Sequence, residues 1–382
     1  MLNHIKFLAQ DIGPRGTGTS SEVKAADYVS DRLKEWDIIH ERLTCRTILS
    51  MNHYPLSINS MGLLALLLFP LNGVWCWIAA FLALLVAPFM ALTIRTSANP
   101  LRLLLPKVSS PTILGRIEPW GMPKHQVVLL SHLDTNRCRL TWKPEVLHRL
   151  EPLTYLTLGM QSLFGFLLLL GVINGHGLTF WFLALIPGVY MFAMIVTLVL
   201  DDQTPYSPGA NDNASSVGVV LNLAERLAKQ PLTSTRVWVA FTGAEETDHY
   251  GLRSILNAYP QEMRDSLFID HEGVGGGEII YITRHGIGLH YFPDQQLLEI
   301  AGKVAAENSD LHVRGKKMTV SEEVSTLTHL RYRAICIAGH DPQTGGLAHW
   351  HQANDTVVNI DSASLKKARD FTLAMLKEID AR

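Results

Sequence analysis

Most of the chain alternates short apolar runs with segments of helical periodicity. Apolar runs bounded by polar residues or glycine, such as 125–134 and 235–246, are typical of buried strands. Segments such as 214–230 and 362–379 place apolar residues at every third or fourth position, which is typical of helices. Strands that alternate with helices predict an α/β fold whose mostly parallel mixed sheet is covered by helices on both faces. The other predicted strands are 266–273, 278–283 and 334–340, and the other predicted helices are 24–36, 249–259 and 294–307.

Two long stretches without a charged side chain interrupt this alternation. Residues 54–94 and 155–200 comprise 41 and 46 residues and contain no Lys, Arg, Asp or Glu. A helix needs about 20 residues to cross the hydrocarbon core, so each stretch is long enough for two crossings. Each is divided by turn-forming residues, "FPLNG" at 69–73 and "VINGHG" at 172–177. The pattern predicts two transmembrane helical hairpins, with buried helices of a large soluble core as the alternative.

The hairpins divide the remaining chain into three parts. A single soluble domain would be assembled from residues 1–53, 95–154 and 201–382, with the hairpins 54–94 and 155–200 inserted between them. Lys and Arg flank the hairpins, whereas the two turns inside them carry neither. Because positive residues concentrate on the cytoplasmic side of membranes, we expect a multi-pass protein in the lipid bilayer whose soluble domain faces the cytoplasm.

Composition and charge exclude several classes of partner. Hydrophobic residues make up 47% of the 382 residues, which favours a folded chain over a disordered one. The net charge is −2 and the charges are scattered, so no nucleic-acid partner is expected. The four cysteines show no CxxC spacing, which favours reduced thiols over disulfides or a cysteine metal site. None of these patterns determines the oligomeric state.

Potential metal ligands follow most of the predicted strands. Ligands of α/β sheets bind beyond the carboxyl ends of the strands, so the residues that follow each apolar run are the candidates. Carboxylates and imidazoles are ligands that Zn²⁺ takes in proteins. Acids gathered in a cleft without a cation would repel one another, so such a cluster predicts a bound metal. The candidates are His132, Asp134, Asp212, Glu245, Glu246, Asp270, His271, Glu272, His349, His351 and Asp355.

Charge balance favours a pair of zinc ions. Two Zn²⁺ ions carry four positive charges, which three carboxylates and one hydroxide balance, and two neutral imidazoles complete the coordination. Taken singly, the same residues also have structural interpretations. Asp212 stands before a predicted helix, where an N-cap is common, and Glu245 and Glu246 follow a strand, where a solvated loop is common.

Six motifs, in this order, resemble those of a known family. They are "DIGPRGTGTSSEVKAADYVSDRLKEW", "SHLD", "PGANDNASS", "FTGAEE", "FIDHEG" and "WHQANDT". Outside the hairpins, the chain resembles the co-catalytic dizinc aminopeptidases of metallopeptidase family 28. The resemblance implies a zinc aminopeptidase-like fold and two zinc ions per chain. It also implies hydrolysis of amino-terminal bonds, by a metal-activated water, in peptides with a free amino terminus.

The resemblance also assigns the metal ligands. A carboxylate has two oxygens, so Asp212 can bridge the two ions. Glu272 stands two residues after Asp270, on the same face of the strand, and is the alternative to it. The implied ligands are His132 and Asp270 at one ion, Glu246 and His351 at the other, and Asp212 at both.

Two further residues receive catalytic roles from the resemblance. Glu245 would stay free of the metal and act as the general base, moving a proton from water to the leaving amine. Asp134 would accept the second ring N–H of His132 and so fix its tautomer. Two other functions stay open: a single-zinc enzyme like the glutaminyl cyclases that share this fold, and a catalytically silent receptor or scaffold.

Overall fold

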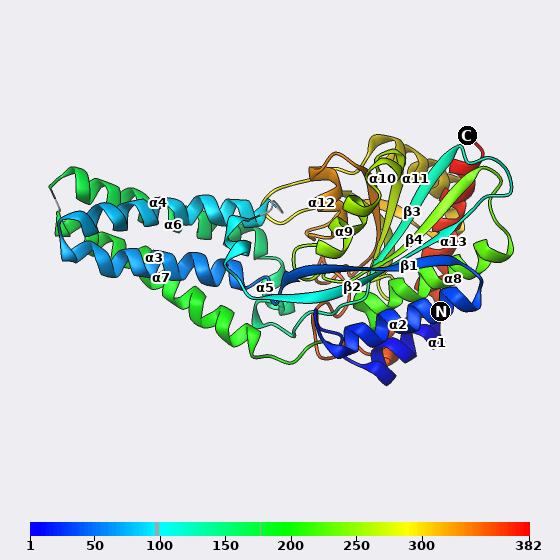
Figure 1. Ribbon diagram of the computed structural model, residues 1–382, viewed down its shortest axis with the longest axis horizontal. Helices are drawn as coiled ribbons and strands as arrows, with labels where there is room; N and C mark the ends of the chain where they lie inside the picture. Colours follow the sequence, from blue (N-terminus) through cyan, green and yellow to red (C-terminus); the bar gives the residue numbers. More distant parts are fainter. Residues whose placement is uncertain (96–98, 176) are drawn as a thin grey trace.

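The chain forms an α/β body from which a bundle of four long helices extends (Figure 1). This computed structural model describes residues 1–95, 99–175 and 177–382. Both termini lie in the body, on the side away from the bundle (Figure 1). His176, which belongs to the predicted second turn, lies outside the described residues.

An eight-stranded mixed sheet forms the centre of the body. Its strands are β1 (Ile39–Ile48), β2 (Lys107–Ile117), β3 (His125–His132), β4 (Thr235–Thr242), β5 (Leu267–Glu272), β6 (Glu278–Arg284), β7 (Arg314–Lys317) and β8 (Arg333–His340). Their order is β1-β2-β4-β3-β5-β8-β6-β7. Strands β4, β3, β5 and β8 are mutually parallel, whereas β1–β2, β2–β4 and β6–β8 pair antiparallel. The sheet is therefore mixed, and the expectation of a mostly parallel sheet holds only for its centre.

Alternate side chains of the central strands enter two separate cores. On β3, Val127 and Leu129 face one core and Val128 and Leu130 face the other, because side chains alternate along a strand. The first core is covered by α1 (Leu2–Lys6), α2 (Ser20–Glu35), α8 (Ser216–Lys229), α11 (Gln295–Glu307) and α13 (Ser362–Asp380). The second is covered by α5 (Pro144–Leu147), α9 (Tyr250–Ala258), α10 (Pro260–Asp265) and α12 (Glu323–His329). Helices thus lie on both faces of the sheet, as the sequence predicted.

Three strands were not predicted from the sequence. β1 and β2 pair along ten residues of each strand, and β7 pairs with β6. β1 and β7 lie at the two edges of the sheet, and most of their side chains are exposed or half-buried. Such strands need no continuous apolar run, so their hydrophobic signal is weak. β1 and β2 also flank the first uncharged stretch, which separates them along the sequence.

Each uncharged stretch forms a pair of helices with a short turn between them. The bundle consists of α3 (His53–Leu68), α4 (Val74–Ile94), α6 (Leu150–Ile173) and α7 (Leu178–Asp202). By length and composition, four helices could cross a membrane: α4, α6, α7, and α3 together with the turn that continues it to Leu71. They pack around an apolar core of their own, yet they also expose large apolar side chains such as Leu67 at 72% and Val189 at 67%. A helix in water would carry polar residues at such positions.

Polar contacts fix the bundle to the body where α7 ends. The carboxylate of Asp202 accepts hydrogen bonds from Ser50 (2.8 Å) and Asn52 (3.0 Å), which precede α3. The neighbouring Asp201 is fully buried and accepts hydrogen bonds from the backbone N–H of Leu140 (2.7 Å) and the hydroxyl of Thr141 (2.6 Å). The first and last helices of the bundle are therefore joined to each other and to the loop that follows β3.

Candidate metal centre

The candidate ligands meet at the carboxyl ends of the central parallel strands. His132 and Glu272 are the last residues of β3 and β5, and Glu246 follows β4 in the next loop. Asp212 lies in the turn before α8, and His351 lies in the loop after β8. All five side chains are buried or nearly so. Strand pairing therefore brings together residues separated by up to 219 positions in the sequence.

Asp212 is shared between the two histidines. Its Oδ1 lies 3.2 Å from Nε2 of His132, and its Oδ2 lies 3.1 Å from Nε2 of His351. The carboxylate of Asp355 holds this turn in place by accepting the backbone N–H groups of Asn211 (2.6 Å) and Asp212 (3.0 Å). Each oxygen of Asp212 is thus directed to a different imidazole, as a bridging ligand requires.

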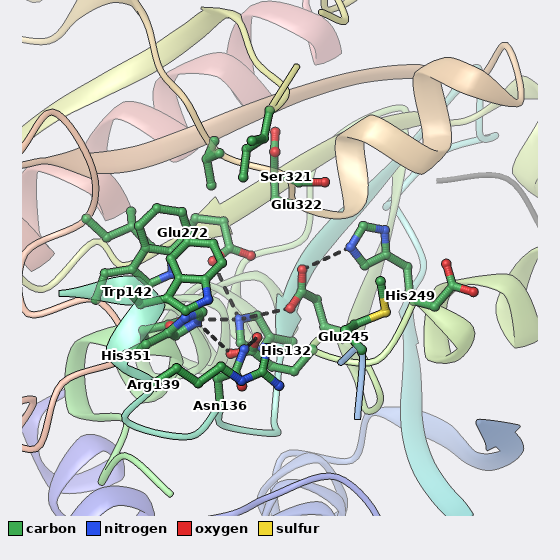
Figure 2. Close-up of a pocket in the computed structure, with 18 of the residues that line it drawn as sticks. His132, Asn136, Arg139, Trp142, Glu245, His249, Glu272, Ser321, Glu322 and His351 are labelled. Atoms are coloured by element: carbon green, nitrogen blue, oxygen red, sulfur yellow. Dashed lines mark hydrogen bonds and ion pairs between the residues drawn. The ribbon is translucent and has the colours of Figure 1, made fainter. Parts of the chain in front are cut away.

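A second carboxylate lies beside each histidine. Oε1 of Glu246 is 3.1 Å from Nε2 of His351, and Oε2 of Glu272 is 3.5 Å from Nε2 of His132. The other oxygen of Glu246 accepts a hydrogen bond of 2.6 Å from the amide of Asn136. Two groups of candidate ligands, each with one imidazole and one carboxylate of its own, therefore share Asp212. His132, Glu272 and His351 are labelled in Figure 2.

The structure places Glu272, rather than Asp270, beside His132. Both residues point to the same face of β5, but Asp270 pairs with Leu130 and so lies two residues short of the strand end. At about 3.3 Å per residue, this sets Asp270 roughly 6.6 Å behind Glu272. Glu272 lines the pocket above the strand ends, whereas Asp270 is fully buried and does not. The ligand position first given to Asp270 is accordingly corrected to Glu272.

The two imidazoles direct their Nε2 atoms at this cluster of acids. The Nδ1–H of His132 donates to the backbone carbonyl of Asp134 (3.0 Å), so the Nε2 of a neutral ring has only a lone pair to direct at two carboxylates. Burial lowers the pKa of His351, but Glu246 and Asp212 outweigh it and raise that pKa to about 9. The cluster therefore favours positive charge at these nitrogens, which protons or divalent cations bound by histidine and carboxylate would supply.

The side chain of Asp134 positions the loop after β4, whereas its main chain contacts the ring of His132. Its Oδ1 and Oδ2 accept the backbone N–H groups of Glu245 and Glu246, each at 3.2 Å, and Oδ2 also accepts the hydroxyl of Thr17 (2.6 Å). The ring Nδ1 of His132 is 3.6 Å from Oδ1 of Asp134 but only 3.0 Å from its backbone carbonyl oxygen. Asp134 thus fixes the tautomer of His132, but through its main chain, which corrects the expected side-chain contact.

Glu245 lies beside the two groups of candidate ligands but is not within hydrogen-bond distance of His132. Its Oε2 is 3.9 Å from Nε2 of His132, and its Oε1 is 3.2 Å from Nε2 of His249 (Figure 2). Burial, followed by repulsion from Glu246 and other nearby acids, raises the pKa of Glu245 well above its usual value, against the opposing effect of His132. Burial lowers the pKa of His249 to about 4. The neutral ring of His249 can therefore donate from Nε2 to Glu245 and accept from the hydroxyl of Thr326 at Nδ1 (2.8 Å).

The pocket above these residues has a volume of about 230 Å³ and includes the ends of the bundle helices. Thr93 and Ile94 at the end of α4, and Thr154 near the start of α6, line it together with residues of the body. Trp142 and Trp350 pack against the imidazole of His351, with ring centroids 4.7 and 5.3 Å from it. The bundle and the body therefore form one binding site between them.

A known family model matches the part of the chain that carries most of these residues. The profile of peptidase family M28 matches residues 201–376. That stretch contains Asp212, Glu245, Glu246, Glu272 and His351. A 57-residue segment is 42% identical to the probable lipoprotein aminopeptidase LpqL of Mycobacterium tuberculosis, over 15% of this chain and 11% of that protein. The chain thus spans only a small part of this curated relative.

Solved structures share the fold at low sequence identity. A glutaminyl cyclase of Bacteroides thetaiotaomicron superposes with a TM-score of 0.57 at 14% identity, over 98% of this chain and 96% of the cyclase. A Zn-dependent exopeptidase of Parabacteroides distasonis superposes with a TM-score of 0.56 at 14% identity, over 99% and 96% of the two chains. Together with the family profile, these similarities support a zinc-dependent, peptidase-like function on a mixed α/β fold.

Two residues of the site were not identified from the sequence. His249 stands four residues after Glu245, and Asn136 stands four residues after His132. A spacing of four residues does not predict a contact here, because both pairs lie in loops and not in a regular helix or strand. Their closeness in sequence to Glu245 and His132 was the one feature of the sequence that could have identified them as site residues.

Proposed function

We propose that this protein is a membrane-anchored zinc aminopeptidase. The observation that carries the proposal is the pair of ligand groups that share Asp212, with Glu245 beside them and not within hydrogen-bond distance of His132. His132 with Glu272, and His351 with Glu246, would hold one zinc ion each, and Asp212 would bind both. The substrate would be a peptide with a free amino terminus. The oligomeric state is left open.

The residues of the chain divide the chemistry among them. When bound, zinc ions polarise the scissile carbonyl and lower the pKa of water. Glu245 is placed to take the proton of the attacking water and to deliver it to the leaving amine. His249 orients one oxygen of Glu245, and the carboxylate of Asp134 holds the loop that carries Glu245 by accepting its backbone N–H groups. Trp142 and Trp350 pack against the ring of His351 and so hold its orientation.

The direct test compares matched peptides with free and acetylated amino termini. The full chain, purified in detergent and loaded with zinc, should cleave the free peptide and leave the acetylated one intact. A chelator such as 1,10-phenanthroline should abolish cleavage, and added zinc should restore it. Equal cleavage of both peptides, or activity unaffected by chelation, would contradict the proposal.

A glutaminyl cyclase is the second candidate, because a cyclase is among the structures that share the fold. Such an enzyme would release ammonia from peptides that begin with glutamine and would leave the peptide bond intact. Mass spectrometry of one glutamine-initiated peptide separates the two reactions, since cyclisation lowers the mass by one ammonia and hydrolysis removes a whole residue.

The assignment of Glu272 predicts different effects on metal content for two neighbouring acids. The variant Glu272→Gln should retain about one zinc per chain instead of two, because a neutral amide oxygen is a weaker zinc ligand than a carboxylate. The variant Asp270→Asn is the matched control and should keep both ions. Zinc is counted by elemental analysis of the purified proteins. Loss of an ion from Asp270→Asn, with none lost from Glu272→Gln, would restore Asp270 as the ligand.

The bundle supports the membrane part of the proposal. Residues 54–94 and 155–200 would be transmembrane hairpins, inserted into a peptidase domain made of residues 1–53, 95–154 and 201–382, with that domain on the cytoplasmic side. Large apolar side chains such as Leu67, Phe81 and Val189 are exposed on the bundle, where lipid would cover them. A continuous surface of this kind is rare on soluble monomers. Accessibility of engineered cysteines in the body, tested in sealed vesicles, would report the orientation.

A further inference from the structure

Arg15, in the first of the six sequence motifs, is a buried cation that the function proposed above does not use. Only 1% of the residue is exposed, and it does not line the pocket above the candidate ligands. Arg15 contacts the main chain of three separate segments. Its guanidinium donates five hydrogen bonds to carbonyl oxygens, from Nε to Leu133 (2.9 Å), from Nη1 to Leu8 (2.8 Å), Gly13 (3.0 Å) and Pro208 (3.0 Å), and from Nη2 to Gly209 (2.8 Å).

Two of these three segments carry candidate metal ligands. Leu133 directly follows His132, and Gly209 stands three residues before Asp212. His132 ends a strand of the sheet, whereas Asp212 lies in a turn that belongs to no strand. Arg15 thus joins the loop after β3 to the turn that carries the shared carboxylate.

Gly209 is packed closely against Arg15 and the loop after β3. Its φ is +64°, which favours glycine, and a Cβ there would lie 2.2 Å from Cγ2 of Thr135 and 2.9 Å from Nη2 of Arg15. Thr135 also pairs with the main chain of Arg15, because its hydroxyl accepts the N–H of Arg15 (3.0 Å) and its own N–H donates to the carbonyl (3.2 Å). A shift of Arg15 would therefore move the Asp212 turn and the loop after His132 relative to each other.

We propose that Arg15 is a positioning residue that holds His132 and Asp212 at the spacing needed to share one metal ion. This inference rests on the proposed metal centre and adds a residue that acts on it through the backbone. Both of these ligands lie on segments that Arg15 joins, whereas the other ion depends on such a segment only through Asp212. Loss of the guanidinium should therefore weaken the ion at His132 more than the ion at His351. Residues that support metal ligands typically change metal affinity by about 10- to 100-fold, and we expect a fall in this range.

Lysine is the conservative replacement for Arg15. Burial lowers the pKa of Arg15 to about 10, against the opposing effects of Asp355 and Asp212, so the guanidinium is charged at neutral pH. An ammonium group is also a cation, but it has three donors instead of five and cannot contact three segments in the same way. Arg15→Lys therefore tests the hydrogen bonds of the guanidinium more than its charge.

The experiment titrates the metal-free full chain, purified in detergent, with zinc and follows binding by calorimetry. The parent protein should bind two ions, and Arg15→Lys should bind one of them with the affinity of the parent and the other about 10- to 100-fold more weakly. The matched control is Arg333→Lys, which should bind both ions like the parent. Arg333 also donates to a main-chain carbonyl, that of Asp265 (2.6 Å), but it lies at the amino end of β8 and does not line the pocket.

Two background variants identify which ion is weakened. Glu272→Gln should leave only the ion at His351 tightly bound, and adding Arg15→Lys should then change the remaining affinity by less than about threefold. Glu246→Gln should leave only the ion at His132, and adding Arg15→Lys should then show the full fall of about 10- to 100-fold.

A second variant covers the case in which Arg15→Lys does not fold. Thr135→Val removes one hydroxyl from the same link and should weaken the ion at His132 by about two- to tenfold, the usual effect of one hydrogen bond. Circular dichroism and thermal unfolding of the metal-free proteins show whether each variant keeps its fold.

The outcomes separate this inference from the proposed function. Parent affinity for both ions in folded Arg15→Lys and Thr135→Val, or an equal fall for both ions, would overturn the role given to Arg15. A parent protein that binds no zinc would contradict the proposed metal centre and this inference with it. Because no readout requires peptide hydrolysis, zinc binding as expected without cleavage of any peptide would contradict only the proposed aminopeptidase.

Discussion

Replacing Glu245 with glutamine is expected to lower kcat for peptide hydrolysis by about 10²- to 10⁴-fold, the usual contribution of a general base. Glutamine keeps the shape of the side chain but cannot accept a proton from water. Because Glu245 is not within hydrogen-bond distance of His132, the variant should keep the zinc content of the parent protein. The measurement is kcat for a free-amine peptide together with zinc per chain.

The control for Glu245 is the same change at an exposed site. Glu307, at the end of α11, is exposed and distant from the pocket residues, so Glu307→Gln should behave like the parent protein. Replacing the supporting His249 with asparagine should have a smaller effect than Glu245→Gln, since His249 only orients the base. Turnover by Glu245→Gln at the rate of the parent would disprove the assignment of the base.

Replacing Asp212 with asparagine is expected to remove most of the bound zinc and, with it, measurable hydrolysis. Asp212 faces both histidines, at 3.2 and 3.1 Å, so its change affects both ligand groups at once. Burial opposes ionisation of Asp212, but hydrogen bonds with His132 and His351 lower its pKa below the usual value, so the native carboxylate carries a full charge. An asparagine would direct an uncharged amide N–H₂ group at one of the two rings.

Metal analysis and a folding measurement test the Asp212 prediction together. Zinc should fall below one ion per chain in Asp212→Asn, whereas Asp270→Asn, the same chemical change at a buried acid outside the pocket, should retain both ions. Circular dichroism should show the same helix content for both variants. Two zinc ions in Asp212→Asn would show that this residue does not bridge them.

The fold was predictable where the sequence carries a continuous apolar signal. The central strands β3, β4, β5 and β8 are buried on both faces, so each appears as an unbroken apolar run. The edge strands β1 and β7 are largely exposed and lack such a run. The omission of β1 and β2 made the sheet seem more parallel than it is, because these two strands make two of its three antiparallel pairings.

The site was predictable in its position and less so in its details. The rule that ligands gather at strand ends identified His132, Asp212, Glu245, Glu246 and His351, and the structure brings these five together. The periodicity of a strand cannot decide between two acids on one face, because only their distance from the end of the sheet differs. Contacts made within loops, such as those of His249, depend on backbone paths that no short-range pattern specifies.

The attachment of the bundle sets the position of the candidate site relative to the four long helices. Four chain crossings and the buried contacts of Asp201 and Asp202 join the bundle to the body, and the helix ends at Thr93 and Ile94 also form part of the pocket wall. In the described part of the chain, these contacts hold the candidate site against the helix ends. If the helices span a membrane and the proposed activity is correct, the site would reach only those peptide ends that lie within a short, constant distance of the lipid surface.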